Sequence, residues 1–131
     1  MKVFRSIRLL FLIVALYDAG LGAAFLFVPG VVFQLGQVTP PNHWAYVQFP
    51  AALLLIFALM FVAIARNPVK NKAMIIYGIL LKLAYCGIAF RYWFSDGIPG
   101  LWKPFAVIDL VTAGLFVWAY GALGALSLRE L

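Results

Sequence analysis

Four long apolar runs, separated by shorter polar or proline-containing segments, dominate the pattern of this chain. They cover approximately residues 7–28, 44–65, 73–94 and 104–126. At a rise of about 1.5 Å per residue, a helix formed by any of these runs is long enough to cross the roughly 30 Å hydrocarbon layer of a membrane. The pattern therefore predicts an all-α integral membrane protein, an up-and-down bundle of four helices that forms a single membrane domain over residues 1–131.

The segment between the first and second runs, Gly30–His43, is short and contains no lysine, arginine or acidic residue. We expect a brief helix at the outer membrane interface over Val31–Leu35, followed by a break at the Pro40–Pro41 pair. Pro50 lies in the second turn of the second run, where it removes one backbone hydrogen bond. The sequence leaves open whether this proline only kinks the helix or also opens a small cavity.

The composition agrees with a membrane protein and excludes a soluble globule. Hydrophobic residues make up 66% of the 131 positions, charged residues make up 11%, and the mean hydropathy is +1.06. Soluble domains average about 45 to 50% apolar and about 25% charged residues. With only four acidic residues, the chain has too little charge to cover a solvated surface.

Six of the ten lysines and arginines lie in two clusters beside the apolar runs, and this placement indicates topology. One cluster precedes the first run and the other separates the second and third runs; their members are Lys2, Arg5, Arg8, Arg66, Lys70 and Lys72. Under the positive-inside rule, both clusters and both termini are cytoplasmic, as in a multi-pass protein of the bacterial inner membrane. No basic stripe alternates with base-stacking aromatic residues, so the net charge of +6 does not indicate binding of nucleic acid.

The basic head and the first apolar run also resemble part of a secretory signal peptide. However, the run is long for such a peptide, contains Asp18, and ends in Phe27–Gly30 without a small-x-small cleavage site. We therefore expect the first run to stay in the protein as a membrane span.

Two charged residues lie near the middle of apolar runs, Asp18 in the first run and Lys82 in the third. A charged side chain at the centre of a membrane helix costs roughly 2.5 to 3.5 kcal/mol on insertion scales, so it usually faces protein or water and finds a partner. Counted from the cytoplasmic ends at about 1.5 Å per residue, Asp18 lies about 16 Å deep and Lys82 about 14 Å deep. We predict an ion pair between them, because each charge then offsets the burial of the other.

Asp109 and Arg91 lie nearer the outer ends of the fourth and third runs. The same count places them about 25 Å and about 27 Å from the cytoplasmic side, which suggests a second ion pair. However, Arg91 follows Lys82 by nine positions and therefore lies on the opposite face of its helix. Arg91 can instead reach outer headgroups or Asp96. Asp109 is then left to Lys82, Tyr85 or water.

These residues define a candidate polar cluster inside the membrane. Its members are Asp18, Lys82, Tyr85 and Asp109, with Arg91 and Tyr17 as secondary members. One interpretation is a structural ion pair that sets the order of the helices; the other is a polar pocket or a proton-linked site. We favour the structural pair, because no second feature of the sequence requires transport.

The sequence contains no recognisable catalytic or metal-binding pattern. It has one histidine, His43, beside Trp44 at a membrane boundary, and one cysteine, Cys86, among apolar neighbours. A metal site would need several further donors, and a nucleophile would need a nearby base. We therefore expect an interfacial histidine, a core cysteine, no metal, no cofactor and no enzymatic activity.

Three stretches carry a resemblance to a known family: Tyr17–Gly30, Tyr77–Tyr85 and Ile98–Leu110. Through them the chain resembles, over nearly its whole length, the small four-helix bacterial membrane proteins of the broad DoxX-like kind. The resemblance implies the four-helix architecture. Because some of these proteins are small subunits linked to quinone-dependent sulfur oxidation, it also suggests a membrane protein complex and a quinone as partners, but it assigns no functional residue.

Small multidrug transporters are also four-helix chains with an acidic residue in the first span. They use a glutamate and work as antiparallel dimers with little charge bias in their loops. This chain instead has an aspartate, a strong loop bias, and an intramembrane lysine that can neutralise the aspartate. The loop bias contradicts dual topology.

The sequence thus predicts a non-enzymatic membrane protein, either an accessory or assembly subunit or a binder of a lipid-soluble small molecule such as a quinone. Its expected partners are the lipid bilayer and a membrane protein complex or a second copy of the chain. The alternative is a proton-coupled small-molecule transporter in which Asp18 exchanges protons for substrate.

Overall fold

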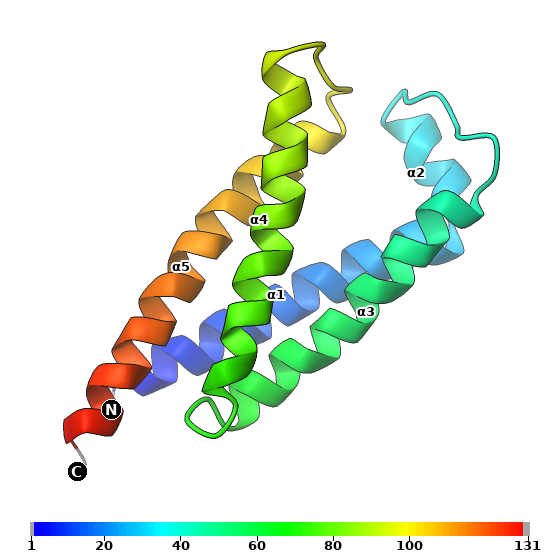
Figure 1. Cartoon of the computed structure of the whole chain (residues 1–131). Coiled ribbons are helices and arrows are strands. Elements are labelled where there is room, and N and C mark those ends of the chain that lie inside the picture. The colour runs from blue at the N-terminus through cyan, green and yellow to red at the C-terminus, as the bar shows by residue number, and fades with distance from the viewer. Residues whose placement is uncertain (1, 130–131) are drawn as a thin grey trace.

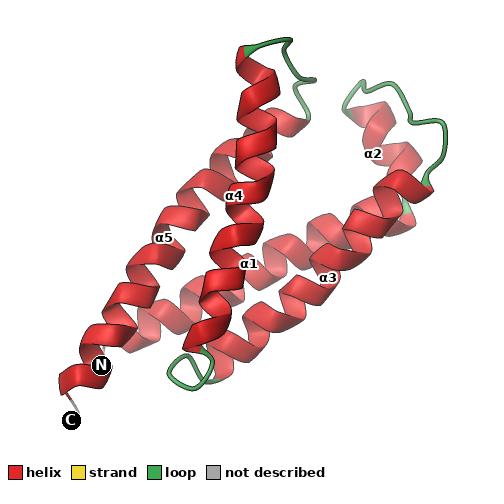
Figure 2. Cartoon of the chain, viewed as in Figure 1, coloured by secondary structure: helices red, strands yellow, loops and turns green. Residues whose placement is uncertain are grey.

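The computed structural model describes the backbone of residues 2–129 and the side chains of residues 2–126. The described part of the chain forms helices joined by turns and loops (Figures 1 and 2). The helices are α1 (Lys2–Phe27), α2 (Pro29–Leu35), α3 (Ala45–Arg66), α4 (Lys72–Phe94) and α5 (Trp102–Arg129). Among them α1, α3, α4 and α5 are long and apolar enough to cross a membrane, which confirms the predicted all-α chain with four long apolar helices.

The helices differ from the predicted runs mainly at their beginnings. α1 starts at Lys2, so the basic residues before the first apolar run are part of the helix. α5 starts at Trp102 and includes Pro104 in its first turn, where the missing N–H of proline would have no helical partner in any case. The brief helix expected over Val31–Leu35 is present and begins two residues earlier, with Pro29 in its first turn.

The long helices form two antiparallel pairs. α1 packs along α3, and α4 packs along α5, whereas contacts between the two pairs are fewer. The start of α1, the α3–α4 loop and the end of α5 gather at one end of the bundle (Figure 1). We call this the basic end, because residues 2–8 and 66–72 carry the two basic clusters; the opposite end, with α2 and the α4–α5 loop, is the α2 end.

The backbones of α1 and α3 approach closely at Gly22. A Cβ atom on Gly22 would lie 2.8 Å from the carbonyl oxygen of Ala51, so only a residue without a side chain fits there unless the helices shift. Nearer the α2 end, the side chain of Gln48 donates a hydrogen bond of 3.0 Å to the carbonyl oxygen of Leu26. This helix pair is therefore held by close backbone contact and by a polar contact at its α2 end.

Three phenylalanines fill the centre of the bundle toward the basic end. Phe11, Phe61 and Phe116 come from α1, α3 and α5 and are fully buried. The ring centroids of Phe11 and Phe116 are 4.6 Å apart, and those of Phe61 and Phe116 are 5.3 Å apart. Gly78 of α4 faces this phenylalanine cluster, and a Cβ atom there would lie 2.8 Å from the Phe61 ring. The four long helices thus meet around one closely packed aromatic core.

A second aromatic cluster lies at the α2 end. The ring of Phe25 stacks on that of Trp102 with centroids 5.6 Å apart, and Phe33 of α2 contacts both Trp44 and Trp102 edge to face. These contacts hold α2 against the starts of α3 and α5. The polar residues of the chain interior lie between the two aromatic clusters.

Candidate functional site

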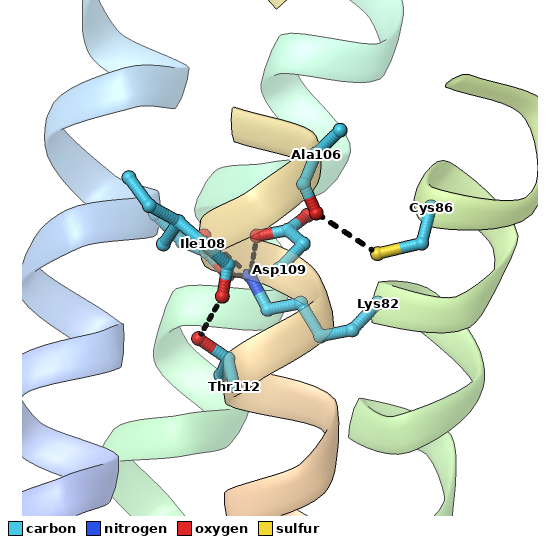
Figure 3. A network of polar contacts seen from close by, with 7 residues as sticks. Lys82, Cys86, Ala106, Ile108, Asp109 and Thr112 are labelled. Carbon is cyan, nitrogen blue, oxygen red and sulfur yellow. Dashed lines mark hydrogen bonds and ion pairs between the residues drawn. The ribbon is translucent and has the colours of Figure 1, made fainter. Parts of the chain in front are cut away.

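One lysine joins two aspartates in the middle of the bundle. The ammonium nitrogen of Lys82 lies 2.9 Å from Oδ1 and 3.0 Å from Oδ2 of Asp18, and 3.2 Å from Oδ1 of Asp109. Figure 3 shows Lys82 extending from α4 toward Asp109 on α5. We call these three residues the charged triad. It links α1, α4 and α5 through charge-assisted hydrogen bonds.

The predicted contact between Asp18 and Lys82 is therefore present. Each of these side chains is only 1% exposed, and Lys82 donates to both carboxylate oxygens of Asp18. Two isolated charges at this depth would be very costly, so each makes the burial of the other tolerable. The Lys82 ammonium also lies 5.6 Å from the centroid of the Tyr17 ring and 5.9 Å from that of Phe61, which adds aromatic faces around the cation.

The suggested pair between Arg91 and Asp109 is wrong, and the alternative in which Asp109 is left to Lys82 is confirmed. Among the described residues, Asp109 forms its ion pair with Lys82, and the Arg91 guanidinium is exposed, 5.7 Å from the ring centroid of Tyr92. The reason is the register of α4 on α5: the thiol of Cys86 contacts the carbonyl of Ala106 at 3.4 Å, so Asp109, one turn further along α5, faces Lys82. Depth counts from the helix ends missed this register.

Tyr85 lines the site but forms no hydrogen bond with the carboxylates of the triad. Its hydroxyl donates to the carbonyl oxygen of Trp102 at 3.0 Å, which ties α4 to the first turn of α5. Cys86, one residue further on, is buried and points its sulfur at α5 (Figure 3), as expected of a core cysteine. The hydroxyl of Thr112 donates a hydrogen bond of 2.7 Å to the carbonyl oxygen of Ile108 on the same helix.

Tyr17 contacts the triad through its ring rather than its hydroxyl. The hydroxyl oxygen is buried, and no side chain or backbone group of the described residues forms a hydrogen bond with it. The ring lies edge-on to Phe105 with centroids 6.4 Å apart. Tyr17 therefore packs between the Lys82 ammonium and the aromatic residues of α5.

His43 lies outside the polar cluster, at the start of α3. Its Nδ1 accepts a hydrogen bond of 3.0 Å from the backbone N–H of Ala45. The first N–H groups of a helix have no partner within the helix, so this contact caps α3. The histidine thus has a structural role at the start of α3.

A cavity of about 370 Å³ lies between the charged triad and the α2 end. All four long helices contribute to its wall, for example through Leu21 of α1, Leu54 of α3, Leu81 of α4 and Phe105 of α5. Pro50, which lies inside α3, is also one of the residues that line it. Two aspartates of the triad and two tyrosines supply the polar groups of a mainly apolar and aromatic lining: Asp18, Asp109, Tyr46 and Tyr85.

The cavity opens at one side and is closed toward the basic end. Tyr46 and Leu53 belong to its lining and are exposed on the surface of α3, which places the mouth beside that helix. The outward surfaces of the long helices are rich in exposed leucine, isoleucine and valine, as on a lipid-facing surface. In the opposite direction the fully buried phenylalanine cluster blocks the centre of the bundle. The mouth is thus suited to entry from the membrane rather than through the basic end.

Sequence reasoning identified the charged residues of the site but missed its walls. Leu54, Phe57 and Phe105 line the cavity, yet they look like any other apolar residue of a membrane helix. The only usable signal was Pro50, whose position early in a span pointed to a local irregularity. The arrangement can hold a mainly apolar molecule with one polar end directed at the carboxylates.

Comparison of the chain with protein-family models, with curated proteins and with solved structures gives no match in any of the three. The geometry of the site is therefore the basis for the proposed function.

Proposed function

We propose that this chain is a non-enzymatic, multi-pass protein of the bacterial inner membrane that binds a lipid-soluble small molecule in the cavity beside the charged triad. The observation that carries the proposal is the cavity itself, apolar over most of its wall and polar where Asp109 and Asp18 contribute to it. Binding sites for small molecules typically combine a volume of about 300 to 1,000 Å³ with apolar walls and a few placed polar groups. The cavity matches that description.

The position of the mouth supports a lipid-soluble ligand. It lies beside α3, where the exposed residues Leu53, Ile56 and Leu59 form part of an apolar outer surface. A molecule dissolved in the bilayer can reach this surface without crossing an aqueous phase. We place the basic end in the cytoplasm by the positive-inside rule, so the cavity then lies in the outer half of the membrane.

The buried part of the triad supports this function by holding the walls in place. Asp18 and Lys82 are nearly inaccessible, so their ion pair joins α1 to α4 rather than offering a reactive group. Buried polar contacts between membrane helices commonly set how the helices are arranged. The structural interpretation of Asp18 and the binding interpretation of the cavity are therefore compatible.

The closed basic end argues for binding over proton-coupled transport. A transported molecule would have to pass Phe11, Phe61 and Phe116, which are fully buried and in mutual contact.

The proposal also includes the partners suggested by the DoxX-like resemblance. These are a membrane protein complex, in which this chain is an accessory subunit, and a quinone as one type of ligand.

The test is saturable binding to the purified protein in lipid nanodiscs, measured by titration calorimetry. Suitable probes are a short-chain quinone, 4-phenylbutanol and 4-phenylbutylamine, which are all small molecules of a size suited to the cavity. Leu54→Trp fills the cavity, whereas Leu59→Trp adds the same bulk to a side chain of α3 that is 71% exposed. We expect Leu54→Trp to weaken binding by about tenfold or more and Leu59→Trp to leave it unchanged. A loss of about 1.4 kcal/mol in binding free energy raises the dissociation constant tenfold.

Two results would count against the proposal. If none of the probes binds saturably to the wild type, the cavity does not bind small lipophilic molecules. If a probe binds but Leu54→Trp and Leu59→Trp retain equal affinity, binding occurs elsewhere on the protein.

A further inference from the structure

We propose that the cavity prefers lipophilic amines in their cationic form, with the ammonium group bound at Asp109. This inference rests on the proposed function and names the class of ligand that the same site would take. It follows from the charge of the triad, from the exposure of its members and from the aromatic residues around the cavity.

The triad has an unequal number of charges. Asp18 and Asp109 face a single ammonium, that of Lys82, so the formal charge of the three residues is −1 when both carboxylates are ionised. None of the described residues that line the cavity is a lysine, arginine or histidine. An unbalanced charge inside a membrane protein is costly, and a cation bound in the cavity would remove the imbalance.

The hydrogen bonds identify the carboxylate that is open to a ligand. Lys82 donates to both oxygens of Asp18 but reaches only Oδ1 of Asp109. Within the described part of the chain, Oδ2 of Asp109 accepts no hydrogen bond. The Asp109 side chain is 13% exposed, compared with 1% for Asp18 and for Lys82. Since Asp109 also lines the cavity, its Oδ2 is the acceptor that a ligand can reach.

The remaining wall suits a cation with an apolar body. Six aromatic residues line the cavity: Phe25, Tyr46, Phe57, Tyr85, Trp102 and Phe105. Aromatic faces attract cations, most strongly when water is excluded, and leucines complete the wall around an apolar tail. The Tyr85 hydroxyl is already committed to the Trp102 carbonyl, so its proton is not free to serve a ligand acceptor.

The same features disfavour other polar ends. A quinone presents only acceptor oxygens, and these would meet the carboxylate of Asp109 without a donor, because the Lys82 ammonium is directed at the two aspartates. An anion would add repulsion to the charge already present. An ammonium group instead supplies both the missing charge and hydrogen-bond donors for Oδ2 of Asp109.

The test compares 4-phenylbutylamine, which is a cation at neutral pH, with 4-phenylbutanol, which has nearly the same shape, can donate a hydrogen bond and is uncharged. Binding is measured in nanodiscs of zwitterionic lipid, so that the membrane surface does not itself attract the amine. We expect the wild type to bind the amine about tenfold more tightly than the alcohol, in the range of a charge-assisted hydrogen bond with an aromatic surround.

Asp109→Asn keeps the shape of the side chain and an acceptor for Lys82 but removes the charge. It should bring the two affinities within about twofold of each other, because the amine loses its counter-charge while both probes keep the same apolar wall. Asp96→Asn is the matched control, because it removes one negative charge from an exposed residue of the α4–α5 loop that does not line this cavity. Its preference for the amine should equal that of the wild type.

The wild-type ratio decides the inference even if Asp109→Asn does not fold. Equal binding of the amine and the alcohol by the wild type overturns it, as does a preference that survives Asp109→Asn. In either case the saturable binding of the alcohol or the quinone would still support the proposed function, whereas the absence of all binding would contradict both.

Discussion

Asp18 and Asp109 accept hydrogen bonds from the same ammonium group, that of Lys82, although they belong to the first and the last long helix of the chain. The lysine therefore joins the two helix pairs, α1 with α3 and α4 with α5, which otherwise have fewer contacts with each other than within each pair. Within the described part of the chain, the other oxygen of Asp109 accepts no hydrogen bond, and Asp109 lines the cavity. The three residues thus join the helix pairs, and the two aspartates among them line the proposed binding site.

The first prediction concerns the stability provided by the triad. Asp18→Asn leaves Lys82 paired with Asp109, so its cost should be limited to about 1 to 3 kcal/mol of unfolding free energy. Asp18→Asn combined with Asp109→Asn leaves the buried ammonium without a counter-charge and should cost about 3 to 5 kcal/mol. Unfolding of the purified protein in mixed detergent and SDS micelles measures these differences.

Adding Lys82→Met to the double variant provides the control for this series. It removes the stranded charge, so the triple variant should regain most of the stability lost by the double variant. A double variant no less stable than Asp18→Asn alone would show that Asp109 is not a functional partner of Lys82. Failure of Lys82→Met to restore stability would show that the stranded charge is not the cause of the loss.

The second prediction concerns the close approach of α1 and α3. Gly22→Ala would place a methyl group 2.8 Å from the Ala51 carbonyl oxygen, which is part of the α3 backbone and cannot turn away. We expect a loss of about 1 to 3 kcal/mol, the usual cost of overpacking. Gly20→Ala is the matched control on the same helix, because a Cβ atom at Gly20 has no neighbour within 4 Å. Thermal unfolding in detergent should therefore separate the two variants, and equal melting temperatures would contradict the helix contact.

The third prediction concerns orientation in the membrane. With Cys86 replaced by alanine, a cysteine introduced as Lys70→Cys lies in the exposed α3–α4 loop and one introduced as Gly100→Cys lies at an exposed position of the α4–α5 loop with space for a side chain. If the basic end is cytoplasmic, a membrane-impermeant maleimide added to spheroplasts should label only Gly100→Cys. Both variants should react after the membrane is opened with detergent. Labelling of Lys70→Cys in intact spheroplasts would reverse the proposed orientation.

The long helices were predictable because each depends on local information. Apolar runs of sufficient length specify membrane helices, and α2 was indicated by the apolar residues after Pro29 and by the prolines that follow it. The contact between Asp18 and Lys82 was predictable as well, since both lie at similar depth and few partners exist for either charge.

The partner of Asp109 and the cavity were not predictable in the same way. The partner depends on the register of α5 against α4, which the contacts of Tyr85 and Cys86 with α5 determine. Depth counting alone suggested Arg91, whereas helical periodicity disfavoured it and left Asp109 to Lys82, Tyr85 or water without choosing among them. The cavity depends on how the two helix pairs diverge toward the α2 end, and that divergence is a property of their packing rather than of any single run of residues.

The order of the three charged residues along the chain has a consequence for biosynthesis. Asp18 enters the membrane with the first helix, Lys82 follows with α4, and Asp109 follows only with α5. When α4 leaves the translocon, Asp18, whose two carboxylate oxygens accept hydrogen bonds from Lys82, is already in the membrane. The costly insertion of Lys82 is therefore offset before α5 is inserted. Asp109 then completes the link as the last helix arrives, which makes closure of the triad a late step of assembly.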